Sequence, residues 1–470
     1  MSIARYQLVE YALIAACACV LAAEHYQLSF ASAHQYLLVQ LALAVGIAAL
    51  LLSHHTRREI SPLYIAALAF VSRFAVREEM RWLGDGLLYK LAVAGVVVTA
   101  VSVWLFPWPD LSELHGEYKT IGVTVGRFGG IECRVLYPSA KTPSAVPPTE
   151  RASILHHGEH LLKGMSVFSG IPAWVFGCLR SGYLAALPNA PVAIPDAENS
   201  ETKKKWPVVI FTHGLGGCID VYSAITQQLA SEGNVVVVVN HCDGSASVTR
   251  TEDNRIEYYQ KITSEVRDNV NGAGFKFRNM QLRQRVQEVR RVLNAVVQEH
   301  KTQVEQGNST SNVFALADVE NVSLVGHSFG GATALTTAHL DERIRAAVLL
   351  DAWMEPVDED VKRGLGTRVP VFHLMSEHFF KWNTNLVDMK THAKGCTHVH
   401  SKLTVLLGSR HNNFCDLPIF SPLVNRLMKA AGKIDPKYAL HAVSQLSAAF
   451  LRGSYAATVA RFPDVIEVDA

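Results

Sequence analysis

The stretch that decides the fold class is Val322-Ser323-Leu324-Val325-Gly326-His327-Ser328-Phe329-Gly330-Gly331. A short apolar run leads into a serine that has a glycine two residues before it and another two residues after it. This G-x-S-x-G pattern is typical of a nucleophile elbow, a strained turn between a buried strand and a helix. Gly326 and Gly330 let neighbouring backbones approach, His327 completes the turn, and the Ser328 hydroxyl is expected at the carboxyl edge of the sheet.

Similar apolar runs lie on both sides of this elbow. Nearly continuous Val, Ile and Leu is expected of parallel strands covered on both faces. The expected strands are 208–212, 235–240, 322–325, 346–350, 369–374 and 403–407, with helices at 221–231, 280–300, 330–339 and 383–394. This alternation predicts an α/β-hydrolase fold, a mostly parallel, doubly wound sheet with right-handed crossovers. The runs 121–125 and 131–137 predict an antiparallel hairpin at one edge.

The serine requires a base and a group that orients the base, and hydrolases of this architecture supply them after the serine, acid first and histidine second. Asp351 directly follows the expected strand 346–350, and His411 follows the strand 403–407. We therefore expect Ser328, Asp351 and His411 to form a catalytic triad. The alternatives are a helix cap for Asp351 and an ordinary surface-loop residue for His411.

A second glycine-containing loop, His213-Gly214-Leu215-Gly216, follows the expected strand 208–212. In this fold the corresponding loop contributes one backbone N–H to the oxyanion hole. We expect the amides of Leu215 and Phe329 to be the two donors. Because His213 precedes the serine in the chain, we expect it to brace the loop rather than to act as the base.

The stretch His156-His157-Gly158-Glu159-His160 spells H-x-x-E-H, the pattern of an inverted zinc peptidase motif. Such a motif needs two histidines on one helix face and a third ligand. Gly158 weakens a helix by about 1 kcal/mol, and no third ligand is recognisable. We therefore expect no metal site and no cofactor.

Composition excludes several classes of protein. The 470 residues carry 44 Lys and Arg against 42 Asp and Glu, so the net charge of +2 gives no basic excess and predicts no nucleic-acid partner. The eight cysteines contain no C-x-x-C pair, which argues against a zinc ribbon or a thioredoxin-type site. The mean hydropathy of +0.14 indicates that part of the chain lies in lipid.

The apolar surplus is concentrated in the runs 11–23, 36–52 and 87–106. Because a bilayer core requires about 20 apolar residues per helix, we expect about three transmembrane helices within residues 1–110, followed by a catalytic domain in 111–470. The run 63–71 is too short to cross and is expected to be interfacial or re-entrant. The alternative is a cleaved signal peptide followed by core helices.

Loop charges indicate an orientation for this integral membrane region. The arginines between the second and third apolar runs are Arg57, Arg58, Arg73, Arg77 and Arg81, whereas 24–35 contains no Lys or Arg. Because positively charged loops stay in the cytoplasm, three crossings would place the catalytic domain on the lumenal or extracellular side.

Several separate blocks occur in a fixed order from about Tyr118 to Pro422. The blocks are 211–216, 221–225, 229–231, His241 with 245–247, 326–333, 350–354, and 408–409 with His411 and 413–414. Together they resemble the platelet-activating factor acetylhydrolases of the plasma, lipoprotein-associated type. The resemblance implies a calcium-independent serine lipase that releases short or oxidised acyl groups from the sn-2 position of phospholipids, with the triad named above.

The resemblance also implies docking on a membrane, because the family has an apolar helix that matches 171–184. In this sequence apolar residues recur there at helical spacing. We expect Ile171, Trp174, Val175 and Leu179 to contact lipid; the alternative is a lid or core helix. The expected partners are a phospholipid substrate and the bilayer, and protein partners are not identified.

Other parts of the chain depart from the family pattern. The N-terminal spans are not part of the plasma enzyme's pattern, and 187–205 and the tail beyond residue 427 match poorly. A phospholipase A1 or a general carboxylesterase is therefore an alternative function. A noncatalytic, membrane-bound binding module with a hydrolase fold is the alternative from another class.

Overall fold

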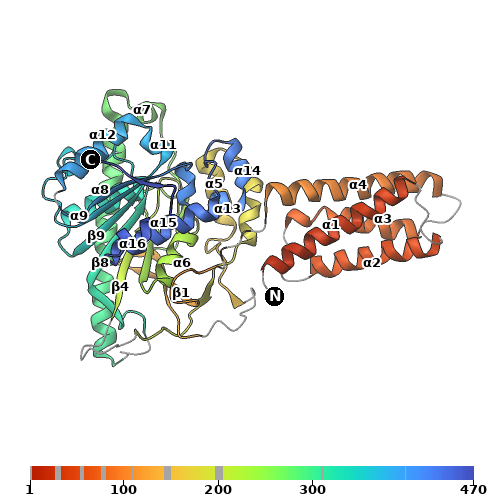
Figure 1. Ribbon diagram of the computed structural model, residues 1–470, viewed down its shortest axis with the longest axis horizontal. Helices are drawn as coiled ribbons and strands as arrows, with labels where there is room; N and C mark the ends of the chain where they lie inside the picture. The colour runs from red at the N-terminus through yellow and green to blue at the C-terminus, as the bar shows by residue number, and fades with distance from the viewer. Residues whose placement is uncertain are drawn as a thin grey trace.

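The chain folds into a slender helical bundle joined end-on to a larger α/β unit (Figure 1). The computed structural model describes residues 3–26, 33–52, 58–75, 81–107, 109, 111, 113–141, 150–195, 205–307, 312–396 and 398–469. The bundle consists of α1 (Ile3–His25), α2 (Ala33–Leu52), the 3-10 helix η1 (Arg58–Ile60), α3 (Leu63–Ala75) and α4 (Arg81–Leu105). Its helices lie along the long axis of the molecule, and α4 leads into the α/β unit.

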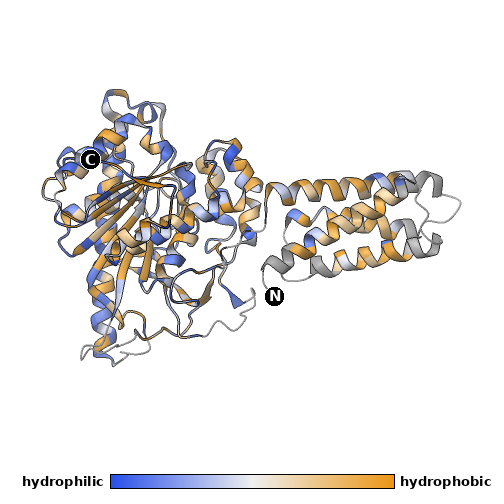
Figure 2. Ribbon diagram, in the orientation of Figure 1, coloured by the Kyte–Doolittle hydropathy of each residue, from blue (hydrophilic) through white to orange (hydrophobic). Residues whose placement is uncertain are grey.

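Hydrophobic residues dominate the bundle (Figure 2). Its interior contains Ile47, Phe70 and Val96, while Leu68 and Trp104 are among large apolar side chains that are exposed. A helix that is apolar on all sides is typical of a lipid environment or of a large protein core. One helical segment, Gly86–Leu105 of α4, is long and apolar enough to cross a membrane, and the other apolar stretches described are shorter.

The short run that we expected at the interface forms α3, which packs against α2 and α4. A Cβ on Gly95 of α4 would lie 2.7 Å from the carbonyl oxygen of Pro62 and 2.9 Å from the amide nitrogen of Ala66. Small residues therefore let the two helices touch through their backbones. With 13 residues, α3 is about 20 Å long, shorter than a bilayer core of about 30 Å. Arg57 and Arg77 lie outside the described residues.

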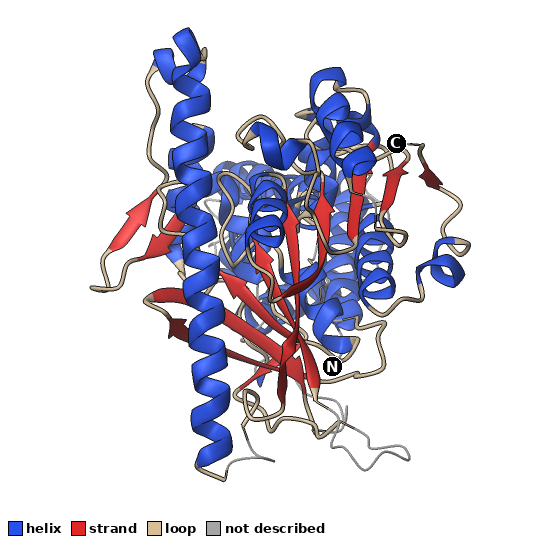
Figure 3. Ribbon diagram, turned by 90° about the vertical axis from the view of Figure 1, so that its left-hand side faces the viewer, coloured by secondary structure: helices blue, strands red, loops and turns tan. Residues whose placement is uncertain are grey.

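A ten-stranded mixed sheet forms the centre of the α/β unit (Figure 3). Its strand order is β12-β11-β10-β9-β8-β4-β5-β2-β1-β3. The strands β4, β5 and β8 to β11 are parallel, whereas β12 is antiparallel to β11 and β2 is antiparallel to β5. The bounds are β1 (Ile121–Phe128), β2 (Ile131–Pro138), β3 (Ala186–Pro188), β4 (Trp206–Thr212), β5 (Val235–Val239), β8 (Ala317–His327), β9 (Ile344–Leu350), β10 (Val371–Ser376), β11 (Lys402–Leu406) and β12 (Val465–Glu467).

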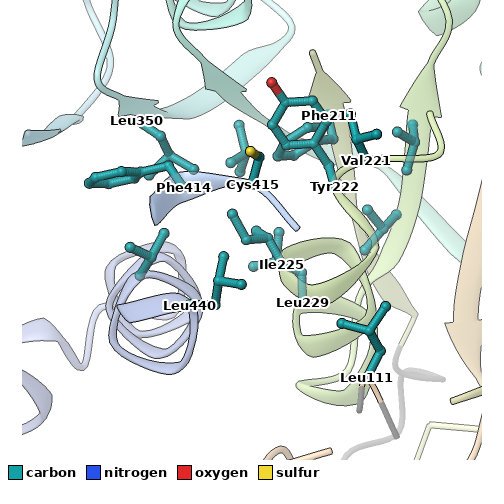
Figure 4. Close-up of a cluster of buried hydrophobic side chains, with 14 of the residues drawn as sticks. Leu111, Phe211, Val221, Tyr222, Ile225, Leu229, Leu350, Phe414, Cys415 and Leu440 are labelled. Atoms are coloured by element: carbon teal, nitrogen blue, oxygen red, sulfur yellow. The ribbon is translucent and has the colours of Figure 1, made fainter. Parts of the chain in front are cut away.

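Helices cover both faces of this sheet. On one face α6 (Ser223–Ser231) and α15 (Pro436–Leu451) pack over a core that includes Phe211, Tyr222, Phe414 and Leu440 (Figure 4). On the other face lie α8 (Ala273–Glu305), α9 (Phe329–Leu340) and α12 (Asn383–Gly395). The remaining elements are α5 (Glu159–Ser169), η4 (Ala173–Ser181), β6 (Val248–Arg250), β7 (Ile256–Tyr258), α7 (Ser264–Arg267), η5 (Val270–Gly272), α10 (Glu359–Lys362), α11 (Glu377–Phe380), η6 (His411–Phe414), α13 (Leu417–Phe420), α14 (Pro422–Leu427) and α16 (Tyr455–Val459).

β4 pairs with β5 on one side and with β8 on the other. After β5 the chain returns to the opposite side of β4 and adds β8 to β11 there. In open α/β sheets, ligands bind beyond the carboxyl ends of the strands at such a switch point. The loop 213–216 follows β4, and the elbow serine follows β8. The fold therefore brings these two loops to the place where a ligand site is expected.

Candidate active site

Ser328 lies in a tight turn between β8 and α9. Its backbone has φ 58° and ψ −118°, a conformation that costs a non-glycine residue about 1–3 kcal/mol. A Cβ on Gly326 would lie 2.1 Å from the Gly330 carbonyl oxygen, and a Cβ on Gly330 would lie 2.1 Å from the Thr212 carbonyl oxygen. Any side chain at either glycine would therefore displace the backbone, so the structure explains the spacing of the motif.

The carboxylate of Asp351 holds the ring of His411. Nδ1 of His411 lies 3.0 Å from Oδ2 of Asp351. Ser376 donates to the same buried carboxylate from its amide (2.5 Å) and its hydroxyl (2.6 Å), and the Phe379 ring stacks on the imidazole with centroids 4.4 Å apart. Because Nδ1–H donates to the carboxylate, Nε2 is left to accept a proton. Asp351 therefore does not act as a simple helix cap, and His411 is not an unattached loop residue.

The elbow and the histidine loop meet at His327. The ring centroids of His327 and His411 lie 4.4 Å apart, so the residue beside Ser328 contacts the candidate base. Among the described residues no hydrogen bond joins Ser328 to His411. Such bonds are often long in ligand-free hydrolases and shorten when substrate binds. The structure thus brings all three predicted triad residues to one edge of the sheet.

The predicted oxyanion loop lies directly against the elbow. A Cβ on Gly214 would be 3.0 Å from the Cβ of Ser328. The Tyr222 hydroxyl accepts from the Gly214 amide (3.0 Å) and bonds to Nδ1 of His327 (2.9 Å), which ties the loop to the elbow. Burial lowers the pKa of His327 well below its usual range, so its ring is neutral and Nδ1 accepts from the tyrosine.

His213 fixes the direction of the Leu215 amide. Nε2 of His213 accepts from the backbone amide of His241 (3.2 Å), so the ring proton is on Nδ1, which donates to the Gly214 carbonyl oxygen (2.9 Å). The C=O and N–H groups of a trans peptide point in opposite directions. The hydrogen bond from His213 that fixes the Gly214 carbonyl oxygen therefore also fixes the direction of the Leu215 N–H. The Leu215 and Phe329 amides donate to no other group in the described part of the chain.

A buried arginine on α8 supports this loop from behind. The Arg285 side chain is fully buried. It donates to the His213 carbonyl oxygen (2.6 Å), to Asp243 (3.0 Å) and to the Ser245 hydroxyl (2.5 Å). Its guanidinium carbon lies 4.4 Å from the centroid of the Phe329 ring. One side chain thus contacts both loops that carry the predicted oxyanion donors.

We expect Arg285→Lys to lower kcat for ester hydrolysis by about 10-fold to 100-fold with little change in KM. Lysine keeps the positive charge beside Asp243 but lacks the planar fork that reaches three partners at once; losing a whole oxyanion donor costs about 10²-fold to 10³-fold. Steady-state kinetics with a soluble ester measures the effect. Arg283→Lys, on the exposed side of the same helix, is the control. A kcat within twofold of the wild-type value would show that Arg285 does not position the loop.

The H-x-x-E-H stretch is not assembled as a helical motif. Gly158 has φ 56° and α5 begins only at Glu159, so His156 and His160 do not share a helix. Nδ1 of His160 lies 2.8 Å from the Tyr258 hydroxyl. His156 and His157 instead bond to Glu132, at 3.1 and 2.7 Å.

His157 is the centre of a buried charge network. Its Nδ1 lies 3.2 Å from Asp220, which also pairs with Arg134 at 2.6 Å. Glu132, His156 and His157 are close enough to share a metal ion, as are His157, Cys218 and Asp220. However, the two carboxylates already accept hydrogen bonds from the histidines and the arginine. Burial alone would lower the pKa of His157, but its bonds to Asp220 and Glu132 outweigh burial and raise that pKa to about 9.

This raised pKa predicts a stability that falls in alkaline solution. The folded-state pKa lies above the unfolded value of about 6.5, so the contribution of His157 is fully present below pH 6.5 and is lost as pH rises through 9. The expected loss is about 3 kcal/mol in the free energy of unfolding. Thermal unfolding of the full chain between pH 6 and 10 measures it. His157→Gln should remove most of this pH dependence and His160→Gln should not; identical profiles for all three proteins would contradict the assignment.

The predicted docking segment forms the 3-10 helix η4 rather than an α-helix, between Pro172 and Gly182. Trp174 is 77% exposed, so lipid contact remains the prediction for this side chain. Ile171 and Val175 are half-buried and line an apolar pocket. Leu179 is 2% exposed within the core, so the docking prediction is wrong for this residue, which packs inward.

Four further contributors were missed by the sequence analysis: Ser376, Phe379, Tyr222 and Arg285. A serine directly after an expected strand is a signal that could have identified Ser376. Tyr222 and Arg285 carry no local signal for these roles: Tyr222 bonds to His327, 105 positions away, and Arg285 bonds to the His213 carbonyl oxygen, 72 positions away.

The sequence blocks and this geometry agree with a comparison against protein families. A family model described as platelet-activating factor acetylhydrolase, isoform II, matches residues 116–459. The chain belongs to the platelet-activating factor acetylhydrolase family. The helical bundle precedes the part that the model of this family matches.

Individual relatives carry corresponding names. A platelet-activating factor acetylhydrolase of Bos taurus is 33% identical over 307 residues, which cover 62% of this chain and 65% of that protein. One of Cavia porcellus is 32% identical over 305 residues, which cover 61% of this chain and 66% of that protein. A putative phospholipase A2 of Schizosaccharomyces pombe is 25% identical over 405 residues, covering 74% and 88%. The match spans about two thirds of the acetylhydrolases' own length.

A solved structure supports the fold of this family member. A ferulic acid esterase from Streptomyces cinnamoneus matches with a TM-score of 0.51 at 20% identity, covering 74% of this chain and 95% of the esterase. The likeness agrees with the α/β-hydrolase fold predicted from the strand order and the elbow.

Proposed function

We propose that this chain is a membrane-anchored, calcium-independent serine ester hydrolase. Its proposed substrates are platelet-activating factor and phospholipids with short or oxidised acyl groups at the sn-2 position. The observation that carries the proposal is the pair formed by Asp351 and His411 beside the strained Ser328 turn. Membership of the acetylhydrolase family supports this choice of substrate class.

In the proposed reaction, Nε2 of His411 removes the proton from Ser328, whose oxygen attacks the ester carbonyl. The Leu215 and Phe329 amides donate to the oxyanion. His411 then gives its proton to the leaving lysophospholipid oxygen, and an acyl-enzyme is left. Water, deprotonated by the same histidine, releases the acid. Every proton transfer and charge in this cycle is handled by the chain's own groups, so the cycle requires no calcium.

The apolar bundle supports the membrane anchor, since α4 has a segment that is long and apolar enough to cross a bilayer. The exposed Trp174 supports contact with the membrane surface.

We also propose a lumenal or extracellular position for the α/β unit, supported by the arginines between the second and third apolar runs. This position requires an odd number of crossings. It therefore requires a different insertion of the bundle from that in Figure 1, where α1 begins at the end at which α4 enters the α/β unit and η1, which starts at Arg58, contacts η4. A glycosylation sequon appended at the C-terminus tests it: glycan attachment in microsomes is the expected result, and a C-terminus open to protease from the cytosolic side would contradict it.

The decisive experiment compares phosphatidylcholines that carry two-carbon and sixteen-carbon sn-2 chains in vesicles without calcium. Much faster release of the two-carbon acid is expected. Release from the sn-1 position would indicate a phospholipase A1, and hydrolysis of simple esters alone would indicate a carboxylesterase. Failure to react with a fluorophosphonate, which requires an activated serine, would indicate a noncatalytic binding module.

A further inference from the structure

An apolar pocket lies where the helical bundle meets the α/β unit. It has a volume of about 180 Å³ and is lined from α5, η4, η6, α13, α14 and the loop after α14. No charged side chain is among its lining residues in the described part of the chain, and its polar groups are a few serine and asparagine side chains. We call it the junction pocket.

One end of the junction pocket adjoins the proposed catalytic groups. Asn412, which lines it, directly follows His411. Phe168, also in its wall, packs against the oxyanion loop, since a Cβ on Gly216 would lie 2.3 Å from the Phe168 ring. A ligand in this pocket would therefore lie beside both the base and the loop that carries Leu215.

The other end adjoins the bundle. Phe106, the residue after α4, lines the junction pocket. The Leu105 carbonyl oxygen accepts a hydrogen bond of 2.8 Å from the Ser421 hydroxyl, and α14 packs against α4. The pocket thus lies between residues that adjoin the proposed catalytic groups and the end of the helix that is long and apolar enough to cross a bilayer. Leu105 and Phe106 lie outside the region matched by the family model, 116–459.

We propose that the junction pocket holds the long sn-1 hydrocarbon chain of a bilayer phospholipid while the sn-2 ester of the same molecule reaches Ser328. The inference rests on the proposed phospholipid hydrolase function. A chain in this position stays in apolar surroundings from the bundle to the ester, so the lipid need not be extracted into water. The predicted docking residues Ile171 and Val175 form part of this wall, where they contact a single chain of the substrate.

The test uses synthetic glycerophosphocholines with an sn-2 acetyl group and sn-1 chains of four to sixteen carbons, with p-nitrophenyl acetate as a soluble ester. For the wild-type protein we expect kcat/KM to rise by up to about fourfold per methylene until the pocket is full. Val424 of α14 lines the pocket. Val424→Trp should therefore fill it and lower kcat/KM at least tenfold for the longest chain, while the soluble ester changes less than twofold. Leu427→Trp, on the same helix but 71% exposed and outside the pocket, is the matched control and should behave as wild type.

Equal rates for all sn-1 chains, or an equal loss on every substrate in Val424→Trp, would overturn the proposal. A second measurement needs no variant: the rate at which dodecyl and ethyl fluorophosphonates inactivate the wild-type protein. In that reaction the Ser328 oxygen bonds to phosphorus, fluoride leaves and the serine proton passes to His411. Faster inactivation by the dodecyl reagent is expected, and equal rates would count against the pocket.

The same data separate this inference from the proposed function. Suppose that the protein hydrolyses the soluble ester and prefers the dodecyl reagent but cleaves no phospholipid. The proposed function then fails, and the junction pocket stands as a binding site for a hydrocarbon chain. If it cleaves phospholipids of every sn-1 chain length at the same rate, the proposed function stands and the junction pocket does not hold the sn-1 chain.

Discussion

Ser328→Ala is expected to lower kcat/KM for a short-chain sn-2 phospholipid by about 10⁴-fold or more. The variant loses the attacking oxygen, and without it the remaining groups give only the slow catalysis that an oxyanion hole and binding provide. The alanine keeps the Cβ of the turn, so the fold should be retained. Hydrolysis in vesicles measures the loss.

The control for this prediction is Ser323→Ala, a serine on β8, the strand that leads into the Ser328 turn. It should keep kcat/KM within about threefold of the wild-type value, as expected for a group outside the chemistry. A Ser328→Ala protein that releases short sn-2 acids at the wild-type rate would sink the assignment of the nucleophile.

Asp351→Asn is expected to lower kcat by about 10⁴-fold with little change in KM. The carboxylate accepts from His411 Nδ1 and twice from Ser376. An asparagine side chain has one oxygen and an NH₂ group, so it cannot accept all three bonds. The NH₂ group facing the ring would favour the tautomer with the proton on Nε2, which leaves no base for Ser328.

Measurement of kcat and KM on a soluble ester checks this prediction, with Asp358→Asn, a half-buried aspartate that bonds to Asn279 and Arg283, as the control. Thermal unfolding should show that both variants are folded. An Asp351→Asn protein within tenfold of wild-type kcat would mean that another group orients His411.

The parts of the site that sequence predicts well are local. The glycine spacing around Ser328 reflects a close approach of neighbouring backbones, because a Cβ on Gly326 or Gly330 would lie 2.1 Å from a carbonyl oxygen. The residues that meet this constraint lie within five positions of the sequence. Asp351 and His411 can be predicted as acid and base because each follows a strongly apolar strand, and parallel strands end at one sheet edge.

The parts that sequence missed depend on long-range or very short structure. The loop of Leu215 is supported by Arg285 of α8, and this contact leaves no pattern near residue 215. The edge strands β3 and β12 have three residues each, too few for a period-two signal. In the segment 171–184, apolar spacing predicted an α-helix, but Pro172, Gly177 and Gly182 favour shorter 3-10 turns.

The direct join between α4 and the α/β unit has a consequence for where the protein acts. The Leu105 carbonyl oxygen accepts a hydrogen bond from Ser421, just before α14, and Phe106 lines the pocket wall, so α4 contacts the α/β unit directly. With the bundle in a bilayer, the active site is held against that bilayer and works in cis, on lipids that diffuse to it within the same leaflet. Lipids of an opposing vesicle stay out of reach. If the proposed anchor and lipid substrate hold, the membrane to which the protein is sorted would select the lipid pool that it turns over.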